Sequence, residues 1–210
     1  VHMKFWANLL LSVFVATYSA SSAHAYSKIE LDAIANRLGA HEQLQAIFEQ
    51  ERVLKGFAKP LKSSGTMLIV KGKGILWHQQ KPVEVAYAIS DDRFISKHAN
   101  SKAVAIDKES NEQVYYYSSM LAKLLQGDIG AIERNFVIEE LLSGKQWHLK
   151  LRPSDSTLSK VFSKIELSGS EYISTVKLFD REGDQTEIRF SEYDYDQVEL
   201  NEYQEELLGK

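Results

Sequence analysis

The side chains that most often carry out enzyme chemistry are present in this chain of 210 residues, but none stands in a catalytic pattern. Four histidines follow the N-terminal segment, with no close helical pair and no His-Glu-x-x-His motif among them; they are His41, His78, His98 and His148. Ser168-Gly169-Ser170 lacks the Gly-x-Ser-x-Gly sequence that exposes a nucleophilic serine on a strand-to-helix turn. Because the chain has no cysteine, a thiol nucleophile, a zinc–thiolate site and a disulfide are excluded. We predict that the protein is not an enzyme and uses no metal and no cofactor.

Two further groups of residues have ordinary structural explanations. Lys71-Gly72-Lys73-Gly74 is rich in glycine but has no Walker pattern and no following helix, so it predicts a turn rather than a phosphate site. Paired carboxylates such as Glu139-Glu140 carry no catalytic meaning in a chain with 29 acidic residues. The formal net charge of -4 argues against a protein that binds nucleic acid by neutralising its phosphates.

The stretch from Phe48 to Pro82 predicts a β-hairpin preceded by a longer strand. Its apolar runs Thr66–Val70 and Ile75–Trp77 are rich in β-branched and aromatic residues, and the glycine-containing turn joins them. Apolar side chains fall on both faces of these strands, whereas a half-exposed strand alternates apolar and polar residues. We therefore expect one face of the sheet to meet the core and the other face to meet a second apolar partner.

Helical patterns interrupt the strands at two places. Ser27 and Glu30 form a capping-box pattern at the start of a predicted helix over residues 28–38. A helical period returns after the first group of strands, ends at Gly127, and is followed by a shorter helix that Asp128 can cap. These patterns predict the α+β class, with helices on one face of an antiparallel sheet.

A single domain is predicted over residues 26–210, because no linker divides the chain. Alternating strands continue as far as Ile106 and resume at Phe136 after the helical insertion. Residues 153–159 are polar and predict a loop. The tail from about residue 194 is acidic and poor in core residues, a composition that does not predict ordered structure.

The first 25 residues have the features of a cleaved secretory signal peptide. Lys4 supplies a positive charge, Leu9–Val15 an apolar segment too short to span a bilayer, and Ala23-His24-Ala25 a small-x-small cleavage site. The mature protein is expected to begin at Tyr26 and to reach the periplasm of a bacterium with two membranes. Because no cysteine follows the cleavage site, the product is not expected to be a lipoprotein itself.

The order and spacing of residues between Phe48 and Pro82 resemble the LolA-like outer-membrane lipoprotein carrier family. The positions that carry the resemblance are Phe48, Gln50, Gly65, Lys71, Ile75, Trp77 and Pro82, with a weaker match in residues 178–180, 183–186 and 188–190. The resemblance implies an antiparallel sheet curved into an incomplete, half β-barrel, with helices forming a lid over a hydrophobic cavity.

At one turn the chain departs from the pattern of that family. The familiar members carry Arg-Pro before the Trp strand, where the arginine holds the lid, and this chain has Lys71-Gly72 there. The resemblance makes Lys71 a candidate contact to the lid. We expect that contact to be weaker, because an ammonium group lacks the planar five-donor fork of arginine.

Apolar residues on the predicted strands and on the lid helix are candidates for the lining of the cavity. Those expected to contact lipid are Leu44, Phe48, Met67, Ile69, Ile75, Trp77, Val85, Tyr87, Tyr117, Leu121 and Leu124. Packing in the core also explains aromatic residues such as Trp77 and Tyr117, and the same side chains can serve both roles.

The resemblance implies a periplasmic carrier that binds the acyl chains of a lipoprotein or lipid and shuttles it from the inner to the outer membrane. Its implied partners are an inner-membrane ABC transporter as donor and an outer-membrane acceptor. A monomer with no nucleic-acid partner is expected. Two alternatives stay open: a related carrier for another hydrophobic cargo, such as a glycolipid or a polyene lipid, and a periplasmic protein-interaction module that binds no lipid.

Overall fold

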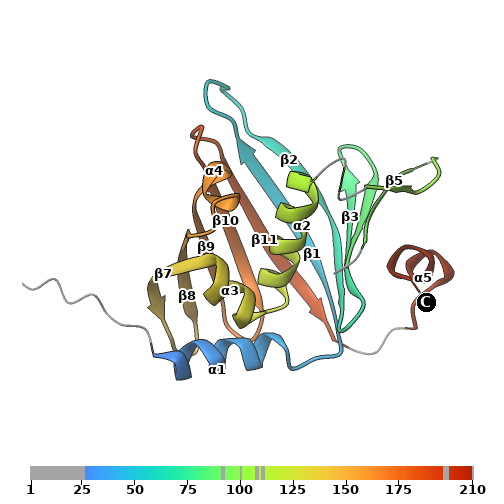
Figure 1. The fold of residues 1–210 in the computed structure, drawn as a ribbon. Coiled ribbons are helices and arrows are strands. Elements are labelled where there is room, and N and C mark those ends of the chain that lie inside the picture. Colours follow the sequence, from blue (N-terminus) through green and yellow to red (C-terminus); the bar gives the residue numbers. More distant parts are fainter. Residues whose placement is uncertain are drawn as a thin grey trace, which may run out of the picture.

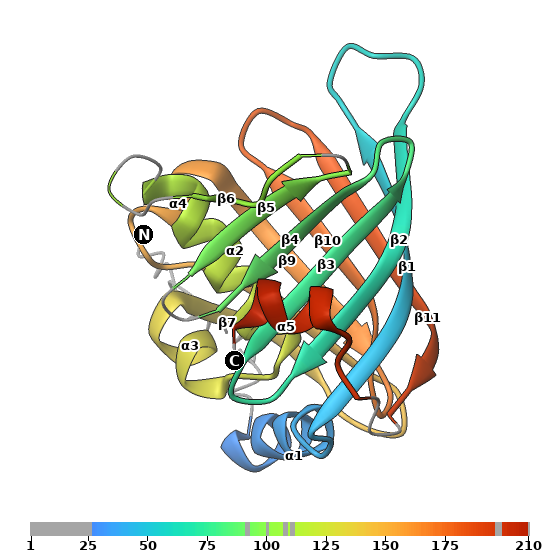
Figure 2. The same ribbon diagram turned by 90° about the vertical axis from the view of Figure 1, so that its right-hand side faces the viewer.

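A curved antiparallel sheet forms the framework of the protein (Figures 1 and 2). The computed structural model describes residues 27–90, 93–99, 101–106, 109, 112–195 and 199–209. Within them the sheet has eleven strands: β1 (Gln43–Val53), β2 (Leu61–Val70), β3 (Gly74–Lys81), β4 (Val85–Ile89), β5 (Phe94–His98), β6 (Val104–Ala105), β7 (Phe136–Leu142), β8 (Trp147–Pro153), β9 (Phe162–Gly169), β10 (Ile173–Asp180) and β11 (Gln185–Asp194). Their order is β6-β5-β4-β3-β2-β1-β11-β10-β9-β8-β7, so β6 and β7 are the edges and the barrel is open. The predicted α+β half-barrel is confirmed.

Helices cover both faces of this sheet. In the described part of the chain they are α1 (Lys28–Leu38), α2 (Glu112–Leu125), α3 (Ile129–Asn135), α4 (Leu158–Val161) and α5 (Glu202–Leu208). Helices α2, α3 and α4 lie over the concave face, α1 lies across one end beside α3, and α5 lies on the outer face (Figures 1 and 2). None of these helices is long and apolar enough to cross a membrane.

Two of the predicted helix starts are confirmed. The backbone N–H of Ser27 donates to Glu30 Oε2 at 3.3 Å, which fixes the start of α1. Asp128 Oδ1 accepts a hydrogen bond of 2.9 Å from the Ala131 N–H and caps α3. Helix α4 was not predicted, because it is a single turn inside a polar segment.

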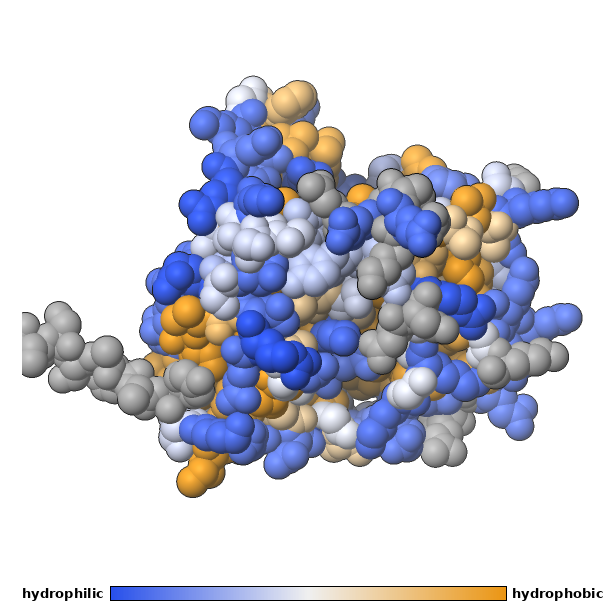
Figure 3. Space-filling view, viewed as in Figure 1, coloured by the Kyte–Doolittle hydropathy of each residue, from blue (hydrophilic) through white to orange (hydrophobic). Residues whose placement is uncertain are grey.

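The concave face carries the main core. Cross-strand pairing sets Phe48 opposite Phe190 and Met67 opposite Trp77, so alternate residues of neighbouring strands form continuous apolar rows. The largest wholly buried side chains of this core are Phe48, Leu31, Ile75, Leu124, Leu149, Leu151, Leu158, Leu167, Ile188 and Val176. Much of the surface on the side of α1, α2 and α3 is hydrophilic, with separate hydrophobic areas (Figure 3).

A second, smaller core lies on the outer face and explains why β2 and β3 are apolar on both sides. Leu207 and Leu208 of α5 pack there with residues of β2, β3 and β4, namely Leu68, Val70, Leu76, Ala86 and Ala88. The second apolar partner expected from the sequence is therefore the C-terminal helix of the same chain (Figure 2). The acidic tail forms α5, which is docked by Leu207 and Leu208, with Leu200 and Tyr203 packed beside them.

Candidate functional site

A cavity of about 460 Å³ lies between α2 and strands β3, β4 and β5. Its lining consists of Ile75, Trp77, Tyr87, Ile89, Phe94, Ser96, Ile106, Val114, Ser118, Leu121, Ala122 and Leu125. This volume falls within the range of roughly 300–1,000 Å³ that is usual for small-molecule sites. It is also well above the cavity of about 150 Å³ that admits benzene in an engineered protein.

Strand register brings one wall of the cavity together. Ile75 pairs with Ile89 and Trp77 with Tyr87 across β3 and β4, and Ser96 of β5 stands beside Tyr87. Paired residues of an antiparallel ladder point to the same face, so these side chains form one continuous surface.

The opposite wall is one face of α2. Val114, Ser118, Leu121 and Leu125 recur at spacings of three and four residues, which places them in a row along the helix. The cavity therefore follows the axis of α2 from its first turn to its last.

Helix α2 also borders a second cavity of about 130 Å³ on its other side. That cavity is lined by Tyr117, Ser118, Met120, Leu121, Leu124, Leu158, Phe162, Ile165 and Leu178. Ser118 and Leu121 line both spaces, so α2 is the wall that the two cavities share. Empty volume therefore flanks α2 on both sides, while Met120 and Leu124 of the same helix pack in the main core.

Six of the eleven predicted lining residues border one of these cavities. Ile75, Trp77 and Tyr87 line the larger cavity, Tyr117 and Leu124 line the smaller one, and Leu121 lines both. Tyr117 also packs edge-on against the Phe162 ring, with centroids 5.8 Å apart, so it docks α2 on the sheet as well. Tyr117 therefore both packs in the core and lines a cavity.

The other five predicted residues lie on the same sheet but line neither cavity. The rings of Phe48 and Trp77 are stacked, with centroids 3.9 Å apart, so Phe48 packs directly against a residue of the lining. Met67 is buried in the main core, and Ile69 packs against that core. Leu44 and Val85 are buried as well.

Several lining residues were not predicted from the sequence. Phe94, Ser96 and Ile106 belong to β5 and to the segment that follows β6, and Val114 and Leu125 lie at the two ends of α2. The helical spacing of Val114 and Leu125 along α2 could have identified these two residues as lining. Nothing in β5 marked its residues as lining, because their role depends on where α2 crosses the sheet.

The chemistry of both cavities suits an apolar chain. Among the described residues, no charged side chain lines either of them, and the polar groups are serine hydroxyls, the Trp77 indole and tyrosine hydroxyls. Burial raises the pKa of Tyr117, so its hydroxyl stays neutral at physiological pH. In the part of the chain that the structure describes, no three His, Asp or Glu side chains are grouped as a metal site requires.

Comparison with known proteins places this architecture in a family. The sequence model described as outer membrane lipoprotein carrier protein LolA matches residues 40–202, which is more than three quarters of the chain. The chain belongs to the LolA family. No curated protein matches its sequence.

Solved structures similar to this LolA-family chain have low sequence identity to it. A DUF1329 family protein from Desulfovibrio piger is 13% identical with a TM-score of 0.48, and the match covers 84% of this chain and 95% of that one. A LolA superfamily protein from Nitrosomonas europaea is 10% identical with a TM-score of 0.48, covering 86% and 98%. A putative outer membrane lipoprotein-sorting protein domain from Vibrio parahaemolyticus is 15% identical, again with a TM-score of 0.48 and coverage of 86% and 98%.

The structure pairs Lys71 with the segment that leads into β1 rather than with α2. Lys71 Nζ lies 3.1 Å from Glu42 Oε1, and the Lys71 N–H donates to the Glu42 carbonyl at 2.9 Å. Both groups extend the β1–β2 ladder by one residue beyond the Gln43–Val70 pair. Among the described residues, Lys71 makes no hydrogen bond to α2.

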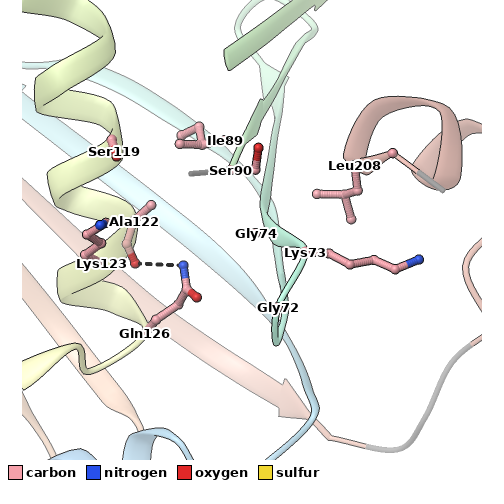
Figure 4. A pocket seen from close by; sticks show the side chains of 11 residues that line it. Gly72, Lys73, Gly74, Ile89, Ser90, Ser119, Ala122, Lys123, Gln126 and Leu208 are labelled. Carbon is pink, nitrogen blue, oxygen red and sulfur yellow. Dashed lines mark hydrogen bonds between the residues drawn. The ribbon is translucent and has the colours of Figure 1, made fainter. Parts of the chain in front are cut away.

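The next three residues of this turn border a cavity that α2 also lines. Gly72, Lys73 and Gly74 border a cavity of about 230 Å³ whose other side includes Ser119, Ala122 and Lys123 of α2 and Gln126, just after the end of that helix (Figure 4). Leu208 of α5 closes it on the outer side, so the turn lies between α2 and α5 (Figure 4). The part of the turn that lies across this cavity from α2 is therefore adjacent to Lys71.

Replacing Gly72 by proline is expected to destabilise the protein. Gly72 has a φ of +75°, whereas proline is restricted to about −65°. The strain should lower the free energy of unfolding by about 1–3 kcal/mol in urea denaturation. Lys71→Arg, at an exposed side chain, is the matched control and should change stability by less than about 0.5 kcal/mol. A neutral Gly72→Pro would show that the turn accepts the Arg-Pro sequence of the family without rearrangement.

Asp155 holds α4 against the smaller cavity and should make its stability depend on pH. Its carboxylate accepts hydrogen bonds from the Leu158 and Thr157 N–H groups, at 2.9 and 2.8 Å. Both bonds lower the pKa of Asp155, and the bond from Leu158 has the larger effect. A lowered pKa in the folded state contributes stability above the unfolded pKa of about 3.9, and this contribution is lost as the pH falls through the folded value.

Asp155→Asn should therefore lower the free energy of unfolding at neutral pH. In this variant the free energy of unfolding should also fall less steeply as the pH is lowered. In urea denaturation at several pH values, the difference in free energy of unfolding between wild type and variant should shrink below about pH 4. A difference that stays constant down to the acid transition would show that the charge of Asp155 does not stabilise α4.

Proposed function

We propose that this LolA-family protein is a non-enzymatic carrier that binds the acyl chain of a lipoprotein or lipid beneath α2. The observation that carries the proposal is the cavity of about 460 Å³ between α2 and β3–β5, whose described lining is uncharged. Burial of hydrocarbon supplies affinity by itself, at about 0.8 kcal/mol for each CH₂ group. No catalytic group is needed for that role.

Helix α2 would act as the lid. It borders both cavities, and the apolar residues on its face would otherwise be exposed to water. Lifting α2 would join the two spaces along Ser118 and Leu121 and admit a longer chain. Opening would also break the packing of α2 against the sheet, and this energetic cost reduces the net affinity for lipid, which allows release.

The cellular route follows from the family and is part of the proposal. After removal of residues 1–25, the protein would work in the periplasm as a monomer. It would take its cargo from an inner-membrane ABC transporter and deliver it to an outer-membrane acceptor. The family description, a lipoprotein carrier, supports this route.

A carrier for a different hydrophobic cargo is the second candidate. It is favoured by Lys71-Gly72, because the lysine is paired with Glu42 and the φ of Gly72 excludes the proline of the Arg-Pro turn. A turn that lacks the Arg-Pro contact to the lid is consistent with a cargo or partner other than lipoproteins in general. Glycolipids and polyene lipids are the classes to test.

The proposal is tested by titrating a polyene fatty acid that accepts energy from tryptophan. Trp147→Phe leaves Trp77, in the cavity wall, as the sole tryptophan of residues 26–210. We expect saturable quenching of Trp77 emission, and competition by saturated fatty acids that strengthens about fourfold for each added CH₂ until the cavity is full. No saturable quenching, or competition independent of chain length, would favour an interaction module that binds no lipid.

A further inference from the structure

The β1–β2 hairpin ends in a tip that projects beyond the sheet. This hairpin tip, defined as residues 53–62, is the outermost part of the described chain at its end of the sheet (Figures 1 and 2). Three large apolar side chains are exposed on it: Phe57 by 68%, Leu61 by 56% and Val53 by 48%. Hydrophobic and hydrophilic side chains lie next to each other on this projecting end in the space-filling view (Figure 3).

The charge of the hairpin tip is opposite to that of the chain. The chain has a formal net charge of -4, yet residues 53–62 contain Lys55, Lys59 and Lys62 and no acidic residue. Lys62 pairs with Glu51 at 2.6 Å, whereas Lys55 and Lys59 make no ion pair with any described residue. Two cations thus lie beside Phe57 with their charge available to an external anion.

The base of the tip is fixed to the neighbouring turn. The Asp184 carboxylate accepts hydrogen bonds from the Lys55 N–H at 2.9 Å and from Arg52 Nη2 at 3.1 Å. Below this point the strands are paired as far as Arg52 and Leu61. The apolar side chains are therefore presented on an anchored hairpin, with much of their surface exposed to solvent rather than buried in the fold.

The same end of the sheet exposes a second apolar turn. Successive turns of an antiparallel meander alternate between the two ends, so the β3–β4 turn lies at the end that carries the hairpin tip (Figure 2). Val83 in that turn is 61% exposed. Val83 therefore adds a further exposed apolar side chain to the end of the molecule that carries the hairpin tip.

We infer that the hairpin tip docks the protein on the surface of an anionic phospholipid bilayer. Exposed aromatic and aliphatic side chains enter the headgroup region, and lysines around them are attracted to acidic lipids. A second copy of the chain is less suitable as the occupant, because a tip of ten residues offers little of the roughly 1,200 Å² that a stable protein interface buries. Docking would hold a lipid carrier beside the membrane from which, or to which, its cargo moves.

Vesicle co-sedimentation tests this inference. The wild-type protein should sediment with vesicles of phosphatidylglycerol and phosphatidylcholine in equal parts, and much less with phosphatidylcholine alone. Phe57→Ser with Leu61→Ser should weaken the binding by about tenfold or more. Lys55→Gln with Lys59→Gln should weaken it by about fivefold for each lysine, and added salt should reduce this effect.

Two matched variants separate docking from cavity binding. Ile29→Ser removes an apolar side chain that is 79% exposed on α1 and should leave vesicle binding unchanged. In the variant that combines Phe57→Ser with Leu61→Ser, the polyene fatty acid should still quench the emission of Trp77. Failure of docking and failure of the carrier proposal are therefore distinguishable. The inference is overturned if the wild type does not bind acidic vesicles, or if the variant with Phe57→Ser and Leu61→Ser binds them like wild type. It is also overturned if Ile29→Ser weakens vesicle binding as much as that double variant does. Capture of a protein partner by the tip without vesicle binding would also overturn it.

Discussion

Ser96→Trp is expected to weaken acyl-chain binding by roughly a hundredfold without unfolding the protein. Ser96 lies on β5, beside Tyr87, in the wall of the larger cavity. An indole at this position would occupy the middle of the cavity and exclude several methylene groups of the ligand. Exclusion of four such groups costs about 3 kcal/mol, or roughly a hundredfold in affinity. The free energy of unfolding should be unchanged or higher, because the new side chain fills space that is empty.

The comparison for this variant is Ser191→Trp. Ser191 is exposed on β11, far from the cavity lining, and the same change of size there should leave the affinity for the fatty acid unaltered. Titration of the polyene fatty acid and urea denaturation would be run on both variants. Equal binding by Ser96→Trp and wild type would show that the ligand does not occupy the space beneath α2.

Leu207→Ala is expected to release the C-terminal helix and to destabilise the protein. Leu207 is 2% exposed and packs with Leu76 and other residues of the outer face. Truncation of a buried leucine costs about 2–5 kcal/mol, limited here to the free energy with which α5 is docked. Release of α5 would also uncover an apolar sheet face, so we expect aggregation at high protein concentration.

Glu206→Ala is the control, because Glu206 is an exposed neighbour on the same helix. Urea denaturation gives the change in stability, and hydrogen exchange at α5 shows whether the loss is local. Unchanged stability and unchanged exchange in Leu207→Ala would mean that α5 does not cover the outer face in solution.

Much of the fold was accessible from the sequence because its signals are local. The capping box before α1, the Asp128 cap of α3 and the turn between β2 and β3 are each set by residues a few positions apart. The apolar character of both faces of β2 and β3 also predicted a second partner for the sheet. The identity of that partner was not predictable, because α5 carries only two buried leucines in an acidic tail.

The candidate site was predictable in part, and the reason lies in the geometry of α2. Trp77 and Tyr87 are adjacent because of the register between β3 and β4, and both residues lie on strands that the sequence pattern predicted. Phe94 and Ser96 line the cavity only because α2 crosses the sheet above them, and no local pattern encodes that crossing. Lys71 illustrates the same limit, since its pairing with Glu42 depends on how the start of β1 aligns with the end of β2.

The most direct test of the carrier proposal is photo-crosslinking with a diazirine-bearing fatty acid, followed by mass spectrometry of the labelled peptides. The account predicts saturable labelling of residues beneath α2, among them Tyr87, Phe94 and Leu121, that excess palmitate suppresses and Ser96→Trp removes. Labelling confined to the outer surface, or labelling that palmitate does not suppress, would contradict the proposal that this cavity holds an acyl chain.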